Sequence, residues 1–279
     1  MLDVDGIMVA ITPNSYLSNK SAIKLRKYLI DNKFIKQIID FKEKKMFPNI
    51  STYCCITIFT KSNKKTLIYN DNTINYDDVN KQDYNLFTKH IEFGDVLGEH
   101  CTISNGIATL RDNIYIHDNK LFDEYCWKTI VTSKKDKWII FPYDDNGVLI
   151  NEIEFKQTNP FTYDFLYENK DILSKRDKGN KTYGSWYAFG RTQSLKRYTG
   201  ETVMYIPTFA DPMSLQYNIR KHELFSSLLC IRLKSNIYTL EQIGSIIKKN
   251  IEYIKTNSSK RGGGWVNISG NTIKNIPLN

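Results

Sequence analysis

The chain has 279 residues, of which 41% are hydrophobic, so it can bury the core of one large domain or two modest ones. Its formal net charge of +9 favours a polyanionic partner, although many basic proteins bind no nucleic acid. Five cysteines, an odd number, and no signal peptide predict reduced thiols in a cytoplasmic protein. No apolar run is long enough for a membrane span, and the four histidines lack metal-binding spacing. We therefore expect no membrane partner and no metal site.

The first sixty residues predict a strand, a helix and two further strands. An apolar run between Gly6 and Pro13 predicts a buried parallel strand. Residues 18–32 place apolar side chains on one helical face and charged ones elsewhere. The apolar face comprises Ala22, Leu25 and Leu29, and the charged residues are Lys24, Arg26 and Lys27. Apolar runs at 34–41 and 53–59 follow, so the segment reads as the last units of an α/β sheet.

Two strings in this block carry a family resemblance. Residues 5–15 (DGIMVAITPNS) and 44–48 (KKMFP) resemble the late catalytic motifs of N6-adenine DNA methyltransferases from restriction–modification systems, in the gamma-type motif order. In that family the second string is a loop whose aromatic residue stacks on the flipped adenine, which implies this role for Phe47. An enzyme that acts on an extruded base has to hold the base against such a surface. The alternative is that Phe47 belongs to the core.

Two other motifs of the family are missing. The family binds S-adenosylmethionine through a glycine-rich loop after its first strand and holds the adenine amino group with Asn-Pro-Pro-Tyr. Here the glycine cluster at 262–264 follows no predicted strand, and the nearest Asn-Pro string, at 159–161, is interpreted as a turn. The resemblance therefore implies S-adenosylmethionine as cofactor of the complete enzyme, none bound to this chain, and no complete catalytic site.

A partner is also implied, namely an N-terminal catalytic half or subunit. The chain would be one subunit of a split enzyme, the product of an interrupted gene or a fragment prepared for study. Residues 63–90 are polar and predict a linker or an extended strand pair. We expect a partial methyltransferase domain at 1–62, with strands and helix of a Rossmann-like α/β sheet, this linker, and a mixed α+β DNA target-recognition domain at 91–279.

The string at 103–116 (ISNGIATLRDNIYI) resembles the start of the recognition domain in Taq-type adenine methyltransferases. Gly106 permits a close approach of the backbone or a positive φ. Thr109 and Arg111 would then donate hydrogen bonds to phosphates or base edges. The alternative is a glycine turn between two core strands.

The string at 175–194 (KRDKGNKTYGSWYAFGRTQS) resembles a Trp-Tyr-x-Phe-Gly-Arg-x-Gln run of the same recognition domains. Arg191 and Gln193 have the chemistry to read guanine and adenine in the major groove, and Tyr187 is a further candidate DNA contact. A basic cluster in the string suits phosphates and comprises Lys175, Arg176, Lys178 and Lys181. The alternatives are a solvated loop for the lysines and a core position for Tyr187 or, more readily, for Trp186.

Towards the C-terminus, residues 203–209 predict a strand and 224–233 form an apolar run. A capping box at 239–242 starts a predicted amphipathic helix that extends to residue 254. Lys260 and Arg261 precede the three glycines and suit a phosphate contact, unless this segment is only a mobile loop.

These resemblances favour a chain that recognises a specific site on double-stranded DNA and contributes to the flipped-adenine pocket. We expect the chain to be inactive as a methyltransferase when it is alone. Two other functions remain. Asp145, Glu154 and Lys156 match the pattern of a Mg²⁺-dependent nuclease if the last two lie on a strand, although 145–147 (DNG) is also a good hairpin turn. The third possibility is a non-catalytic interaction remnant that binds neither DNA nor cofactor.

Overall fold

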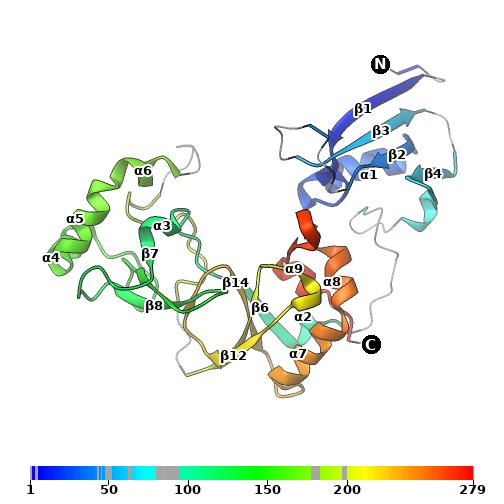
Figure 1. Ribbon diagram of the computed structural model, residues 1–279. Helices are drawn as coiled ribbons and strands as arrows, with labels where there is room; N and C mark the ends of the chain where they lie inside the picture. The colour runs from blue at the N-terminus through cyan, green and yellow to red at the C-terminus, as the bar shows by residue number, and fades with distance from the viewer. Residues whose placement is uncertain are drawn as a thin grey trace. The chain divides into compact units, whose positions relative to one another are not determined.

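The computed structural model describes residues 2–3, 6–42, 44, 46–47, 52–61, 64–79, 84, 95–176, 183–196 and 200–278. The chain divides into two compact units, Met1–Phe93 and Gly94–Asn279. Both units mix helices with sheets, so the expected mixed α/β class is confirmed (Figure 1). In the described part of the chain, no helix combines the length and the apolar character that crossing a membrane requires.

The first unit is built on a mixed sheet with the strand order β1-β3-β2-β4-β5. Its elements are β1 (Ile7–Pro13), α1 (Ile23–Asp31), β2 (Ile35–Asp40), β3 (Cys54–Thr60), β4 (Thr66–Tyr69) and β5 (Asn72–Asn75), with 3-10 turns at Asn14–Leu17, Lys20–Ala22 and Tyr76–Asp78. The predicted order of strand, helix, strand and strand is therefore confirmed. Leu17, Ile30, Ile38, Cys55 and Leu67 lie in its core.

The prediction that the first strand is buried and parallel is wrong. β1 pairs antiparallel with β3 and lies at the edge of the sheet, where the Val9 side chain is 60% exposed. Ile7, Met8 and Ile11 are exposed as well. An apolar run shows that a strand is suited to burial on both faces, but it does not show what covers those faces. Among the described residues, nothing pairs with the second edge of β1.

The predicted helical face is also only partly right. Leu29 is buried, but Leu25 is exposed and Arg26, which we placed on the charged side, is buried. The Arg26 guanidinium donates hydrogen bonds to the carbonyl oxygens of Tyr16, Asn19 and Tyr84. These carbonyls give the buried charge polar partners, which a periodicity argument does not foresee.

For residues 63–90 the sequence left a linker or an extended strand pair open; their described part forms the strand pair, which extends the first sheet. β4 pairs parallel with β2 and antiparallel with β5, so residues 66–75 form a strand pair inside the first unit. The boundary between the units consequently falls after Phe93 rather than near residue 62.

The described part of the second unit contains two four-stranded sheets and a small three-stranded one, with orders β12-β10-β14-β6, β13-β8-β9-β7 and β11-β16-β15. Its strands are β6 (Cys101–Asn105), β7 (Ile116–His117), β8 (Trp127–Val131), β9 (Lys137–Ile140), β10 (Thr202–Pro207), β11 (Phe209–Ala210), β12 (Asn218–Lys221), β13 (Leu224–Phe225), β14 (Leu228–Leu233), β15 (Ser259–Lys260) and β16 (Val266–Asn267). Its helices are α2 (Leu97–His100), α3 (Asp112–Tyr115), α4 (Glu152–Thr158), α5 (Pro160–Glu168), α6 (Lys170–Ser174), α7 (Leu240–Lys249), α8 (Ile251–Asn257) and α9 (Gly270–Lys274).

Two large cores stabilise the described part of this unit, beside a smaller buried cluster on β8, β10, β13 and β14. One lies under β8 and β9 and is closed by α4, α5 and α6, which follow one another in green in Figure 1. The other lies between the β6–β14 pair and the helices α7, α8 and α9. The Asn-Pro string predicted to be a turn is the junction of α4 and α5, where Pro160 is the first residue of α5.

The predicted C-terminal helix divides into two. Its capping box is confirmed, because Thr239 accepts from the Gln242 backbone and the Gln242 side chain accepts from the Thr239 backbone. The helix ends at Lys249, however, and α8 begins only after Asn250. Leu240, Ile243, Ile247 and Ile254 are all buried, so both helices present the predicted apolar face to one core.

The exposed β1 edge gives the first prediction. An uncovered apolar edge strand pairs with other chains, and a lysine on such a strand prevents this pairing. We expect Val9→Lys to lower self-association, measured by light scattering after gel filtration, without loss of circular dichroism. Ile237→Lys, at a similarly exposed apolar residue of the second unit, is the control. If both variants self-associate as the unchanged chain does, the exposed edge of β1 is not the surface through which the chains associate.

Candidate nucleic-acid interface

The two strings singled out in the recognition region lie side by side, although their paired residues Ala108 and Arg191 are about eighty positions apart in the sequence. The backbone N–H of Arg191 donates to the carbonyl of Ala108 at 3.0 Å, and that of Gly190 donates to the carbonyl of Thr109 at 3.1 Å. Ala108 and Arg191 therefore form an antiparallel bridge. Each string supplies backbone partners for the other, so neither loop is independent.

Side chains extend this connection. The Gln193 amide donates to the carbonyl of Gly106, and the Ser194 hydroxyl donates to the carbonyl of Asn105. The expected close approach at Gly106 is confirmed, because a Cβ at this position would lie 2.6 Å from the Phe225 carbonyl oxygen. Any larger residue would push the loop away from β13.

The joined strings form one wall of a hollow of about 560 Å³. Arg111 and Gln193, two of the predicted contacts, line it together with the Gly106 backbone. Its other polar lining residues are Asn105, Asp112 and Asn113 of the first string, and Thr208, Ser226 and Ser227, which the sequence did not single out. The two serines had a signal, since they interrupt the apolar run at 224–233 and separate β13 from β14. The hollow therefore presents several donors and acceptors beside a guanidinium group.

The backbone around this hollow adopts an unusual conformation at three places. Leu110, Ser194 and Ser227 have φ angles of 61°, 55° and 60°, a region that residues other than glycine seldom occupy. Leu110 also fills the space that a Cβ on Gly190 would need, at 2.3 Å. Strained backbone of this kind gathers at ligand-binding and catalytic sites, where the surrounding structure holds it in place.

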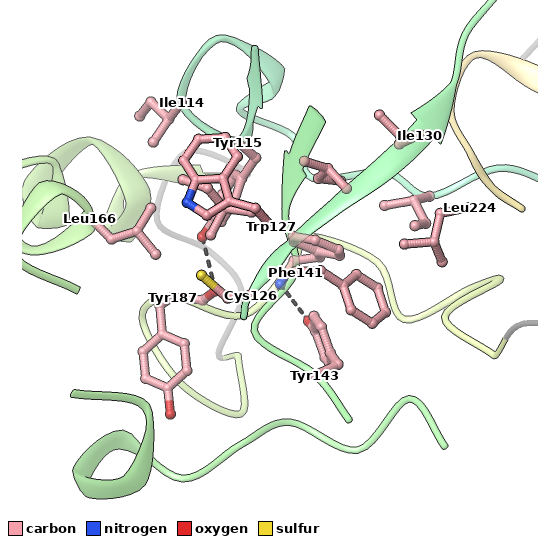
Figure 2. Close-up of a cluster of buried hydrophobic side chains, with 14 of the residues drawn as sticks. Ile114, Tyr115, Cys126, Trp127, Ile130, Phe141, Tyr143, Leu166, Tyr187 and Leu224 are labelled. Atoms are coloured by element: carbon pink, nitrogen blue, oxygen red, sulfur yellow. Dashed lines mark hydrogen bonds between the residues drawn. The ribbon is translucent and has the colours of Figure 1, made fainter. Parts of the chain in front are cut away.

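An aromatic core supports the hollow from within the unit. The Tyr115 hydroxyl donates to the Tyr187 carbonyl at 2.9 Å (Figure 2). The Phe189 backbone N–H donates to the Tyr143 hydroxyl. Burial raises the pKa of Tyr143 to about 12. The Tyr187 side chain is itself buried, and its hydroxyl donates to the carbonyl of Ile150. Tyr187 is therefore a core residue and not the surface contact we expected.

Arg176 is likewise buried instead of facing a phosphate. Its guanidinium donates to the carbonyls of Leu173, Trp186 and Ala188 and stacks on the Tyr183 ring. By these bonds it ties the end of α6 to the Trp-Tyr-x-Phe-Gly-Arg run, so its role is to position that run. Lys175 beside it is exposed, whereas Lys178 and Lys181 lie outside the described residues.

Two other candidates have structural partners. The Thr109 side chain is buried and donates to the Asp112 carboxylate, while it accepts from the Arg111 backbone. It therefore shapes the loop that carries Arg111. Trp186 packs against the same core, and its indole N–H donates to Glu152 at 3.0 Å. This hydrogen bond, more than the one from Tyr163, lowers the pKa of the Glu152 carboxyl.

Lys260 and Arg261 lie at the small three-stranded sheet. Lys260 ends β15, and the three glycines after Arg261 form a 3-10 turn that leads into β16. The Arg261 backbone donates to the Trp265 carbonyl at 2.7 Å, so this turn is closed by its own hydrogen bond. Both basic side chains are exposed.

Phe47 belongs to the first unit and is 41% exposed. Met46 before it is exposed too, while residues 48–51 lie outside the described part of the chain. The alternative that Phe47 is a core residue therefore does not hold. Its ring is accessible to a partner.

The arrangement required by the nuclease alternative is not formed. Glu154 and Lys156 lie on helix α4 instead of a strand. The Asn151 amide donates to the Glu154 carboxylate, and the Lys156 ammonium lies over the Tyr163 ring. Residues 145–147 form the expected turn, closed by the Asp144–Val148 and Tyr143–Leu149 pairings. Among the residues that the structure describes, no three His, Cys, Asp or Glu side chains gather as a metal site.

All five cysteines are free and buried. Burial raises the pKa of Cys126 to about 12 and that of Cys101 to about 11. Both thiols therefore stay protonated near neutral pH and behave as small apolar core residues.

The chain was compared with protein families and with individual proteins of known function. Residues 1–47 match the family described as Eco57I restriction-modification methylase. The chain is 22% identical over 287 residues to the Type II restriction enzyme and methyltransferase RM.Eco57I of Escherichia coli, a match that spans 80% of this chain and 28% of the relative. It is 24% identical to the Type II methyltransferase M.HindII of Haemophilus influenzae, over 91% of this chain and 58% of the relative. The chain thus spans less than two thirds of each of these relatives.

Two solved structures share the fold. One is the Type IIL restriction-modification enzyme MmeI in complex with DNA, with a TM-score of 0.62 and 10% identity, over 98% of this chain and 39% of that one. The other is a nuclease-deletion mutant of the Type ISP enzyme LlaGI in complex with a DNA substrate mimic, with a TM-score of 0.50 and 10% identity, over 98% and 28%. In sequence and in fold, therefore, the chain is similar to restriction–modification enzymes that include methyltransferases.

The positioning role of Arg176 can be tested against its neighbour, because Arg176 is buried and Lys175 is exposed. Arg176→Met leaves three carbonyl acceptors without their donor, and each unsatisfied buried group costs about 1–3 kcal/mol. We expect it to lower the free energy of unfolding of the second unit by at least about 2 kcal/mol, whereas Lys175→Met changes it by less than about 0.5 kcal/mol. All four tryptophans lie in the second unit, so their fluorescence during urea unfolding reports on that unit. Equal stability of the two variants would contradict the role assigned to Arg176.

Proposed function

We propose that this chain recognises the DNA site and supplies part of the flipped-adenine pocket of a site-specific adenine-N6 DNA methyltransferase of a restriction–modification system. The second unit is the target-recognition part, and the first unit is the late portion of the catalytic sheet. The observation that carries the proposal is the joining of the two predicted recognition strings around one polar hollow. The similarity to RM.Eco57I and M.HindII supports a methyltransferase-related role, and the fold shared with DNA-bound MmeI supports DNA as partner.

The proposed contacts are the accessible members of the predicted set. Arg111, Gln193 and the Gly106 backbone line the hollow, and Arg191 pairs with Ala108 in the bridge that joins the two strings. Base edges in the major groove present acceptors and donors that arginine and glutamine side chains match. Lys175 and the Lys260–Arg261 pair are assigned to phosphates, where sequence-independent affinity arises. Arg176, Tyr187 and Thr109 act behind this surface by shaping it.

S-adenosylmethionine is the methyl donor of the complete enzyme in this proposal, yet the described residues do not fit it. A glycine-rich donor loop connects a strand to a helix, so that backbone N–H groups at the helix end face the ligand. Gly262–Gly264 instead connects two short antiparallel strands of the second unit. We therefore propose that the donor and the remaining catalytic motifs come from a further catalytic portion.

The first unit has a surface suited to that portion. β1 leaves one edge unpaired among the described strands, and a hollow of about 830 Å³ adjoins it. The hollow is lined mainly by apolar side chains, including Met8, Leu25, Leu29, Phe34 and Phe59. A strand added beside β1, with a helix seated in the hollow, would remove both from water. We propose that the catalytic portion covers β1 in this manner.

Arg191 provides a test of base reading. Duplexes with randomised positions are bound to the chain and the retained sequences are determined. We expect the unchanged chain to enrich one motif, and Arg191→Ala to lose about 1–3 kcal/mol of affinity for it and to accept any base at one position, because a bidentate guanine contact is removed. Lys249→Ala, an exposed charge at the end of α7, is the matched control and keeps the motif.

The other outcomes have definite meanings. A uniform loss of affinity for all sequences in Arg191→Ala would make this side chain a phosphate contact. No binding by the unchanged, folded chain would contradict DNA recognition by the isolated chain and support the interaction remnant.

Phe47 is tested in the chain joined to its catalytic portion. We expect Phe47→Ala to reduce the methylation rate while duplex affinity stays nearly unchanged, because the ring acts only on the extruded base. Methylation is followed by transfer of a labelled methyl group, and affinity by filter binding. Met46→Ala, at an exposed apolar neighbour, is the control. Equal losses of affinity and rate in Phe47→Ala would contradict the stacking role.

A further inference from the structure

A pair of stacked aromatic rings lies on the surface of the second unit, one residue beyond the recognition hollow. Thr208 lines the hollow, and Phe209 follows it in β11. The Phe209 ring stacks on that of Trp265 with centroids 4.9 Å apart and an interplanar angle of 25°. Phe209 is 52% exposed and Trp265 is 43% exposed. Two large rings stacked on each other and still open to water form a flat apolar surface without a cover in the described part of the chain.

The backbone that carries this pair is firmly held. β11 and β15 both pair with β16, so Phe209 lies opposite Asn267 and Lys260 lies opposite Val266. Val266 and Ile268 are buried in the core under α7, α8 and α9. The Ile268 backbone also donates to the Thr208 carbonyl at 2.7 Å, which ties the wall of the hollow to this sheet. The rings are thus presented by ordered strands and not by a loose loop.

The charge next to the rings is positive. Lys260 and Arg261 lie on the strand and turn that lead to Trp265, and among the described residues neither of them forms an ion pair. Gly263 and Gly264 have φ angles of 74° and 83°, and a Cβ on Gly264 would meet nothing within 4 Å. The turn beside the rings is therefore open as well as cationic.

We propose that the Phe209–Trp265 pair is a DNA wedge, which unstacks a base step next to the recognition hollow while Lys260 and Arg261 hold the adjoining phosphates. This inference rests on the proposed DNA recognition and adds to it a site that bends or opens the duplex. Apolar side chains inserted between base steps, flanked by cations, unstack the step and kink the DNA. The aromatic surface recognises the face of any base, so it contributes affinity without reading the sequence.

The test uses the full chain and a mixed-sequence duplex. Of the four tryptophans, Trp127 is buried, Trp138 and Trp186 are half-buried, and Trp265 is the most exposed. We expect DNA to quench tryptophan emission and to shield the fluorophore from acrylamide. Trp265→Phe, which keeps an aromatic ring, should bind nearly as the unchanged chain does but lose most of the quenching. This conservative variant also guards against misfolding.

Affinity separates a wedge from a charged contact. Removing one base–aromatic contact costs on the order of tenfold in affinity, and we expect this loss in Phe209→Ala with no change in the salt dependence of binding. Lys260→Ala with Arg261→Ala should instead reduce the salt slope by about two. The control is Phe161→Ala, because Phe161 is also exposed and stacked, on Phe122, but lies on α5. It should bind DNA as the unchanged chain does.

The proposal is overturned if Phe209→Ala binds as tightly as the unchanged chain, if DNA leaves Trp265 emission and acrylamide access unchanged, or if Phe161→Ala loses as much affinity. A failure confined to these variants, with Arg191→Ala relaxing the sequence motif, removes the wedge and leaves the proposed recognition standing. If the unchanged chain binds no duplex, both fail together. A change in protein association in Phe209→Ala, without any effect on DNA, assigns the surface to a protein partner and overturns the wedge.

Discussion

The second unit depends on the backbone pairing between residues 106–109 and 190–194. The carbonyls of Ala108 and Thr109 accept from Arg191 and Gly190, and side chains of Gln193 and Ser194 close the ends of this contact. In an isolated loop, water would hydrogen-bond to these backbone groups, and the loop would have no defined shape. Because each loop is the hydrogen-bonding partner of the other, the polar hollow has a fixed wall. The strained φ angles of Leu110 and Ser194 are held by the same contact.

Arginine illustrates how one residue type serves two purposes in this chain. Arg26 and Arg176 are both buried, and each guanidinium donates to three backbone carbonyls and so connects segments distant in sequence. The planar group, with five donors in a fixed arrangement, suits this connecting role better than a lysine ammonium would. The lysines of the described segments remain mostly at the surface. The basic surplus of the sequence is therefore divided between internal connections and the surface field that favours a polyanion.

The sequence predicted the elements well and their surroundings less well. The strand–helix–strand–strand order, the capping box at Thr239 and the close approach at Gly106 follow from local rules, so each was accessible to prediction. Whether β1 is covered, and whether Arg176 or Tyr187 faces water, depends on residues distant in sequence. A motif match indicates that a residue matters but does not indicate whether it touches a ligand or holds the residue that does. Tyr187 and Arg176 hold the loop, whereas Arg111 and Gln193 line the hollow.

The polar residues that line the hollow beyond the two strings also could not be predicted from the sequence. Thr208, Ser226 and Ser227 come from the ends of strands whose apolar residues form the core, so in the sequence they resemble ordinary strand breaks. They gain their position because β13 and β14 run on either side of the 226–227 step and β6 pairs with β14. The site is thus formed where strands end, and the strands beneath it fix its geometry. Under the proposed function, variation of such terminal residues would alter which DNA sequence the hollow accepts, while the buried residues of β10 and β14 keep the fold unchanged.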